Sequence, residues 1–149
     1  MDAIQELVNR EKPQQAAIIG GGYIGLEMAE ALRQRQVGVT LIEVANQVMV
    51  AADPEMVTSL NQELKLHGVD LRLGTSVKSF VEEGNLLYIQ LNTGESLPCG
   101  LAILATGVRP DVRLAQEAGL AIGQTGGILV DEHPTARPSV SGRITTSGA

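Results

Sequence analysis

The chain is poor in cysteine, in aromatic residues and in basic side chains. Cys99 is the only cysteine among the 149 residues, which excludes an internal disulphide and a four-cysteine metal site. The aromatic residues are Tyr23, Phe80 and Tyr88, so aliphatic side chains must fill the core. Acidic residues outnumber basic ones by 17 to 11. This balance argues against binding to nucleic acid, because sequence-independent binding requires a clustered basic surface.

Long apolar runs are also missing. No run approaches the ~20 residues that a membrane-spanning helix needs, and the N-terminus lacks the pattern of a signal peptide. Charged residues make up 19% of the chain, a proportion that favours folding over disorder. We therefore expect one soluble, cytoplasmic domain over residues 1–149, without membrane contact and without a metal site.

Helical and extended patterns alternate along the chain, as in α/β proteins. Apolar residues at helical spacing predict a short helix before Pro13 and a second helix from Gly22 onward. A third helix begins after Asp53, and its expected apolar stripe consists of Met56, Val57, Leu60 and Leu64. Short apolar or alternating runs predict parallel strands near residues 15–20, 39–43, 69–73 and 101–106.

Between the last two of these strands the pattern changes. Three short extended runs are separated by Glu83-Gly84-Asn85 and Asn92-Thr93-Gly94, which are typical of hairpin turns. The predicted fold is a Rossmann-like three-layer α/β fold with a central parallel sheet, helices around it and an antiparallel β-meander on one face. Residues 15–111 form its core, and the tail from Gly119 onward, which includes residues 126–149, is rich in Gly, Thr, Ser and Pro and is expected to hold two short strands.

A glycine-rich turn joins the first strand to the second helix. Gly20, Gly22 and Gly25 fit the pattern G-x-G-x-x-G in the strand–turn–helix context that the pattern requires. The first glycine permits the tight turn, the second lets the backbone approach a pyrophosphate, and the third lets helix and strand pack closely. Amides at the helix start then hold the phosphate charge. We expect Ile24, inside this turn, to contribute to the same site.

Glu43 ends the next strand, 18 residues after Gly25. A carboxylate at this position can accept hydrogen bonds from both hydroxyls of an adenosine ribose. Together with the glycine turn it indicates a nucleotide site rather than a plain turn and a solvated strand end. NAD, FAD and S-adenosylmethionine all remain open at this point, because the glycines do not distinguish them.

Three stretches carry a family resemblance: Ile19-Gly-Gly-Gly-Tyr-Ile-Gly-Leu-Glu27, Val39-Thr-Leu-Ile-Glu43 and Ala105-Thr-Gly-Val-Arg-Pro-Asp111. They closely resemble pyridine nucleotide-disulphide oxidoreductases, nearest the branch of NADH oxidases, NADH peroxidases and coenzyme A-disulphide reductases. The resemblance implies an NAD(P)H-binding domain inserted within a larger FAD-binding domain. It also implies a homodimeric full-length parent with NAD(H) and FAD as cofactors.

The resemblance assigns a role to each matching residue. Gly20, Gly22 and Gly25 match the pyrophosphate loop, and Glu43 matches the ribose acid. Tyr23 matches a tyrosine that covers the flavin, and Glu27 matches a glutamate near the nicotinamide carboxamide. Thr106 and Gly107 match the backbone beside the nicotinamide pocket. The implied function is to position nicotinamide for hydride transfer to flavin.

Several family features are missing from the sequence. It holds no second glycine-rich loop for FAD and no N-terminal redox cysteine, and Ala149 takes the place of an acid that binds the flavin. Cys99 is interpreted as a buried structural thiol. We therefore expect a fragment of a larger flavoenzyme that is inactive alone. The alternatives are an NAD(H)-sensing module without catalysis and an S-adenosylmethionine-dependent methyltransferase domain.

Overall fold

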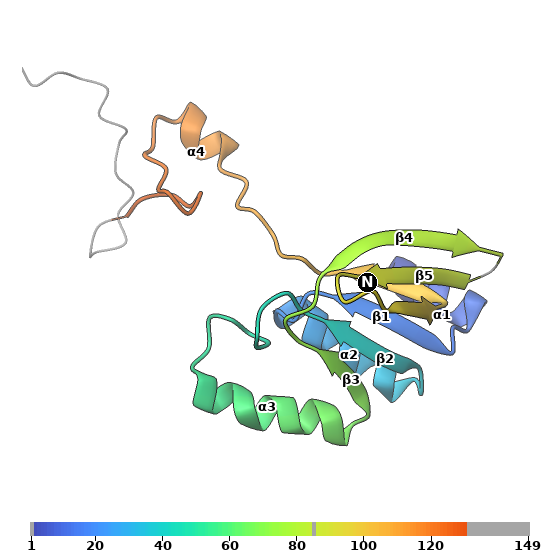
Figure 1. Cartoon of the computed structure of the whole chain (residues 1–149). Coiled ribbons are helices and arrows are strands. Elements are labelled where there is room, and N and C mark those ends of the chain that lie inside the picture. The colour runs from blue at the N-terminus through green and yellow to red at the C-terminus, as the bar shows by residue number, and fades with distance from the viewer. Residues whose placement is uncertain (1, 85, 131–149) are drawn as a thin grey trace, which may run out of the picture. The chain divides into compact units, whose positions relative to one another are not determined.

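The computed structural model describes residues 2–84 and 86–130, which fall into two compact units divided after Gly107. The first unit contains a parallel sheet with the strand order β3-β2-β1-β7 (Figure 1). Its strands are β1 (Gln15–Ile19), β2 (Gly38–Ile42), β3 (Val69–Arg72) and β7 (Leu101–Leu104). The helices are α1 (Asp2–Glu11), α2 (Tyr23–Gln34) and α3 (Pro54–Leu66).

The expected meander is present as a separate antiparallel sheet with the order β4-β5-β6. Its strands are β4 (Val77–Glu83), β5 (Leu86–Leu91) and β6 (Ser96–Cys99). A register shift between Val77 and Ser79 gives β4 a bulge opposite β5.

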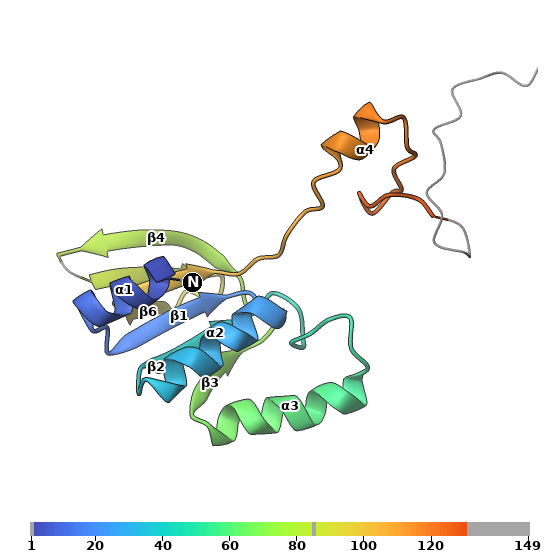
Figure 2. The ribbon, with the colours of Figure 1, turned by 180° about the vertical axis from the view of Figure 1, so that it is seen from behind.

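Alternation along the parallel strands builds two cores, one on each face of the sheet. Ala16 and Ile18 belong to the cluster that includes the buried side of α2 and Val57 of α3, whereas Ala17 belongs to the cluster with Ile89 of the meander. The helices therefore cover one face (Figure 2) and the meander covers the other. This arrangement confirms the predicted three-layer α/β fold, with the helices on a single face.

One residue of the apolar stripe predicted for α3 is not buried. Met56 is 70% exposed, while Val57 is buried and Leu60 and Leu64 pack against the core. The buried face of α3 is narrower than the apolar stripe, because this helix contacts the sheet and α2 along one side only.

The second unit is described over residues 108–130. It contains the short helix α4 (Arg113–Glu117) and one bridge between Ile122 and Ile128, which is the described part of the extended structure expected in the tail. The remainder of that tail, including Ala149, lies outside the described residues.

Candidate functional site

The strand order places a crevice at the carboxyl edge of the parallel sheet. From β1 the chain proceeds to β2 and β3 on one side, and β7 later returns to the other side of β1. In open α/β sheets, ligands collect beyond the carboxyl ends of the strands at such a reversal. The segments that leave β1, β2 and β7 carry Gly20, Glu43 and Thr106. Three of the predicted site segments therefore meet at one edge.

A cavity of about 400 Å³ opens at this edge. Of the predicted residues, it is lined by Gly20, Gly22, Glu43, Thr106 and Gly107. Most of the remaining lining is aliphatic or small: Ile19, Ile42, Val44, Val50, Thr75, Ser76, Val77 and Ala105. Among the described residues that line the cavity, only Glu43 has an ionisable side chain.

The glycine turn has the geometry that a phosphate site needs. Gly20 has φ +112°, and a Cβ there would collide with the carbonyl of Ala105. Gly25 is buried, and a Cβ there would collide with the carbonyl of Gly20. At Gly22, by contrast, a Cβ would meet nothing within 4 Å. The backbone of Gly22 is therefore open toward the cavity, whereas the other two glycines are required by the fold.

The start of α2 is left free for an anion. Gly22 is the N-cap residue, and no described side chain caps the helix or places an acid in its first turn. Unpaired amides at a helix start attract negative charge, aided by the helix dipole. The end of α2 that borders the cavity is thus suited to a phosphate group.

Glu43 follows β2 directly, and its carboxylate lies at the cavity wall. Its Oε2 accepts a hydrogen bond from the amide of Gly21 at 2.6 Å, and its Oε1 accepts one from the amide of Ala45 at 2.8 Å. A carboxylate offers about four acceptor positions, so these two bonds leave capacity for ligand hydroxyls.

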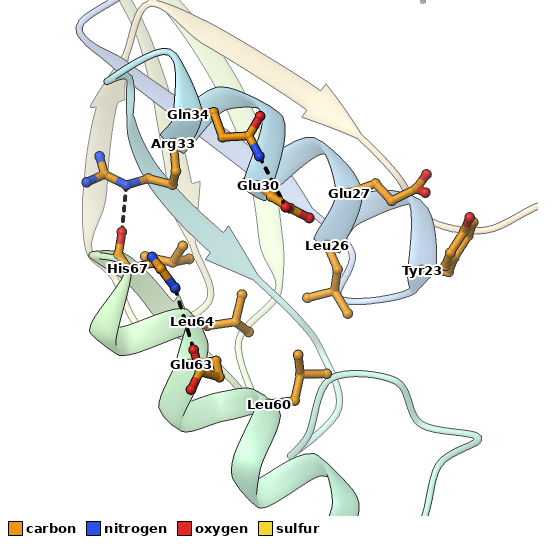
Figure 3. A pocket seen from close by; sticks show the side chains of 11 residues that line it. Tyr23, Leu26, Glu27, Glu30, Arg33, Gln34, Leu60, Glu63, Leu64 and His67 are labelled. Carbon is orange, nitrogen blue, oxygen red and sulfur yellow. Dashed lines mark hydrogen bonds and ion pairs between the residues drawn. The ribbon is translucent and has the colours of Figure 1, made fainter.

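Tyr23 and Glu27 lie one turn apart on α2 (Figure 3). They do not line this cavity. They line a separate groove of about 550 Å³ between α2 and α3. Tyr23 is 65% exposed. A hydrogen bond to Glu27, together with the negative charge of that carboxylate, raises the pKa of the Tyr23 phenol above its ordinary value.

The rest of this groove is built from the facing sides of the two helices. Leu26 of α2 and Leu60 and Leu64 of α3 form its apolar part (Figure 3). Arg33 donates from Nε to the carbonyl of His67 at 2.8 Å, which fastens the end of α3 to α2. The groove therefore lies between two fixed helices.

Sequence reasoning missed most of the cavity wall and included four residues that do not line it, namely Tyr23, Ile24, Gly25 and Glu27. Val44 and Val50 belong to the loop after β2, Thr75 and Ser76 belong to the link between β3 and β4, and Val77 begins β4. Val44 was detectable as the neighbour of Glu43, but the others are brought in by tertiary folding. Ile24 lies in the first turn of α2, is 46% exposed and is not part of the lining.

Neither a metal site nor a membrane span is found in the described part of the chain. No group of three or more His, Cys, Asp and Glu side chains is placed to hold a metal ion there. None of the described helices combines the length and apolar character needed to cross a membrane.

Cys99 should react slowly with thiol reagents while the chain is folded. It is 3% exposed in the core beneath the meander, and burial raises the pKa of its thiol. Both effects suppress the reactive thiolate near neutral pH. We expect modification by 5,5′-dithiobis(2-nitrobenzoate), followed by absorbance, to be at least ~10-fold slower than in urea-unfolded protein. Equal rates in folded and unfolded samples would contradict the structural role of Cys99.

Sequence comparison identifies relatives of this chain. The model of the family "Pyridine nucleotide-disulphide oxidoreductase" matches residues 1–142. The NAD(P)H coenzyme A polysulfide/persulfide reductase of Pyrococcus horikoshii is 38% identical over 131 residues. That alignment covers 87% of this chain and 29% of the relative, so the chain spans less than a third of its length.

Solved structures agree with this comparison. Reduced Bacillus anthracis CoADR-RHD is 40% identical with a TM-score of 0.79, over 93% of this chain and 24% of the other. The water-forming NADH oxidase of Lactobacillus brevis, bound to NADH, is 32% identical with a TM-score of 0.73, over 89% of this chain and 29% of the other.

An engineered variant of that oxidase is an NADPH oxidase and was solved with NADPH. Its substitutions replace a glycine by alanine and then, further along its chain, an aspartate by alanine, an alanine by arginine, a methionine by serine and a proline by arginine. Members of the matched family depend on NAD(P)H and FAD. On the family match over nearly the whole sequence, this chain belongs to the pyridine nucleotide-disulphide oxidoreductase family.

Proposed function

We propose that this chain is the NADH-binding part of an FAD-dependent oxidoreductase and positions nicotinamide for hydride transfer to flavin. The observation that carries the proposal is the cavity where the open backbone of Gly22 and the carboxylate of Glu43 meet at the carboxyl edge of the sheet. A pyrophosphate and an adenosine ribose require these two groups side by side. The family match supports the cofactor class, and the cavity between Gly22 and Glu43 supports the proposed position of the dinucleotide.

The residues present fit a dinucleotide. The amides at the start of α2, next to Gly22, would hold the pyrophosphate, and Glu43 would accept hydrogen bonds from the adenosine ribose. Thr106 and Gly107 would border the nicotinamide end. When bound, NADH supplies the hydride and flavin accepts it, so the chain contributes orientation.

Tyr23 and Glu27 are proposed to face the flavin side of the nicotinamide. Both project from the first turns of α2, the helix whose start borders the cavity. The Glu27 carboxylate raises the pKa of the Tyr23 phenol, so the two side chains influence each other on one helix, although most of the tyrosine surface is exposed. In this proposal, the groove between α2 and α3 holds the two residues that the family resemblance assigns to the flavin side.

The engineered NADPH oxidase supports the assignment of Glu43. Its substituted aspartate lies as far beyond the substituted glycine as Glu43 lies beyond Gly25. At the same spacing, its other three substitutions fall on Val44, Ala45 and Val50. Glu43, Val44 and Val50 all line the cavity, so positions altered together with a change of nucleotide in that enzyme coincide with this wall.

Because the chain spans 29% of the Pyrococcus horikoshii relative, we also propose that residues 1–149 form one part of a longer flavoenzyme. The family resemblance implies that this longer enzyme is a homodimer. The family match favours an oxidoreductase over a methyltransferase. A parent sequence with flavin-binding segments on both sides of this chain would favour the enzyme over a non-catalytic NAD(H) sensor.

The isolated chain should bind NADH but catalyse nothing. Its described residues form one glycine-rich dinucleotide turn, and Cys99 is buried away from the cavity lining. Calorimetry should show one NADH site, whereas the purified protein should be colourless and should not consume NADH with oxygen or a disulphide. Absence of NADH binding would overturn the proposed function. A yellow protein with stoichiometric flavin would contradict the predicted inactivity.

A further inference from the structure

Gly21, which occupies a variable position of the glycine pattern, is held on both sides by the loop that follows β2. Its amide donates to Oε2 of Glu43 at 2.6 Å. Its carbonyl accepts a hydrogen bond from the amide of Met49 at 2.8 Å. The glycine turn is thus tied twice to residues 43–49, a segment that belongs to a different strand–helix connection.

The loop that meets Gly21 is itself constrained. Met49 has φ +48°, a left-handed conformation that a residue with a side chain rarely adopts. Val48, next to it, is completely buried, and the carbonyl of Met49 accepts a hydrogen bond from Ala52 at 2.7 Å. A buried anchor and two hydrogen bonds therefore hold Met49 in this conformation.

Space at Gly21 is also limited. A Cβ there would lie 3.0 Å from Cγ1 of Val48 and 3.2 Å from both Cβ and Cγ of Glu43. These contacts are tighter than ordinary van der Waals distances. A side chain at this position would push against the residue whose carboxylate binds the Gly21 amide.

We propose that Gly21, Glu43 and Met49 form a loop latch that fixes the pyrophosphate turn against the opposite wall of the cavity. In this latch Glu43 is a positioning residue for the glycine turn, in addition to its proposed contact with the ribose. The latch sets the spacing between Gly22 on one side and Val44 and Val50 on the other, since these residues flank the latch and line the cavity. The inference rests on the proposed NADH-binding function.

Two probe ligands separate the positioning role of Glu43 from its ribose contact. ADP carries both adenosine-ribose hydroxyls, whereas 2′,3′-dideoxy-ADP lacks them and keeps the pyrophosphate. Glu43→Gln preserves size but sets an NH2 group against one of the two backbone amides, a donor facing a donor. If Glu43 acts through the latch, this variant binds the dideoxy ligand at least ~5-fold more weakly than the wild type in calorimetry.

The loss of the Glu43 negative charge should change the affinity in the opposite direction from the loss of the latch, so the two effects can be distinguished. Removing a carboxylate near a bound anion should by itself tighten binding. A purely ribose-contacting Glu43 therefore predicts equal or tighter binding of dideoxy-ADP by Glu43→Gln, and that result would overturn the latch. The control Glu55→Gln removes an exposed carboxylate from the first turn of α3, away from the cavity lining, and should leave both affinities within ~2-fold.

A second variant tests whether the carboxylate acts through Gly21. Gly21→Ala should also lower the affinity for dideoxy-ADP. Because both changes break the same contact, the affinity of the double variant Gly21→Ala/Glu43→Gln should equal that of whichever single variant binds dideoxy-ADP less tightly. Additive losses would show that the two residues act separately and would overturn the latch.

Amide hydrogen exchange of the wild type tests the latch without a ligand or a variant. The amides of Gly21 and Ala45 should both be protected, because each donates to Glu43. Unprotected exchange at Gly21 would overturn the latch even if the variants fail to fold. Wild-type protein with a protected Gly21 amide that binds neither ADP nor NADH would instead overturn the proposed function.

Discussion

Gly22→Val should lower the affinity for NADH by at least ~10-fold, or ~1.4 kcal/mol, while the domain stays folded. Gly22 has φ −78° and ψ −177°, an extended conformation that valine adopts readily. A Cβ there meets no protein atom within 4 Å, so the new side chain enters the cavity rather than the core. It would occupy the space through which a pyrophosphate approaches the backbone. Calorimetric titration with NADH measures the loss, and thermal unfolding verifies the fold.

Ser79→Val provides a control within the same unit. Ser79 is an exposed residue of strand β4 and does not line the cavity, and valine is readily accommodated in a strand. This variant should keep wild-type affinity for NADH. If Gly22→Val is folded and binds NADH as tightly as the control, the pyrophosphate does not lie at this turn.

Local pattern was sufficient to predict the fold, because each element has its own periodicity and end signals. The change from helical spacing to short alternating runs after residue 76 predicted the meander, and Pro54 after Asp53 predicted the start of α3. The exposure of Met56 was not predictable in this way. An apolar stripe shows which helix face is apolar, but the width of the buried face depends on what packs against it.

The residues of the candidate cavity were predictable only where one short segment of sequence contains the complete pattern. Gly20 and Gly22 are fixed by the strand–turn–helix context, and Glu43 by its place at the end of the next strand. Gly21 carried no signal, because the pattern accepts any residue there and the restriction comes from Val48 in a later loop. For the same reason the sequence did not place Tyr23 in a groove apart from the cavity, since that depends on how α2 and α3 pack.

NADH should bind at least ~10-fold more tightly than NADPH, a difference of about 1.4 kcal/mol at low ionic strength. The two nucleotides differ by a phosphate on the adenosine 2′-oxygen, which in the proposed arrangement lies beside Glu43. The carboxylate accepts hydrogen bonds from a hydroxyl but repels a phosphate of the same sign. Added salt should narrow the gap, because it screens charge repulsion. Titration calorimetry with both reduced nucleotides measures the preference.

The same reasoning predicts how the preference is reversed. No Lys or Arg lines the described cavity, and Val44, next to Glu43, is 71% exposed at its wall. The double variant Glu43→Ala with Val44→Arg removes the repelling charge and adds a guanidinium that can bind the 2′-phosphate. This double variant should bind NADPH at least as tightly as NADH. The control Leu66→Arg adds the same cation at an exposed position of α3 that does not line the cavity, and it should keep the wild-type preference. Equal affinities for the two nucleotides in the wild type, or an unchanged preference in the double variant, would mean that the adenosine ribose does not lie beside Glu43.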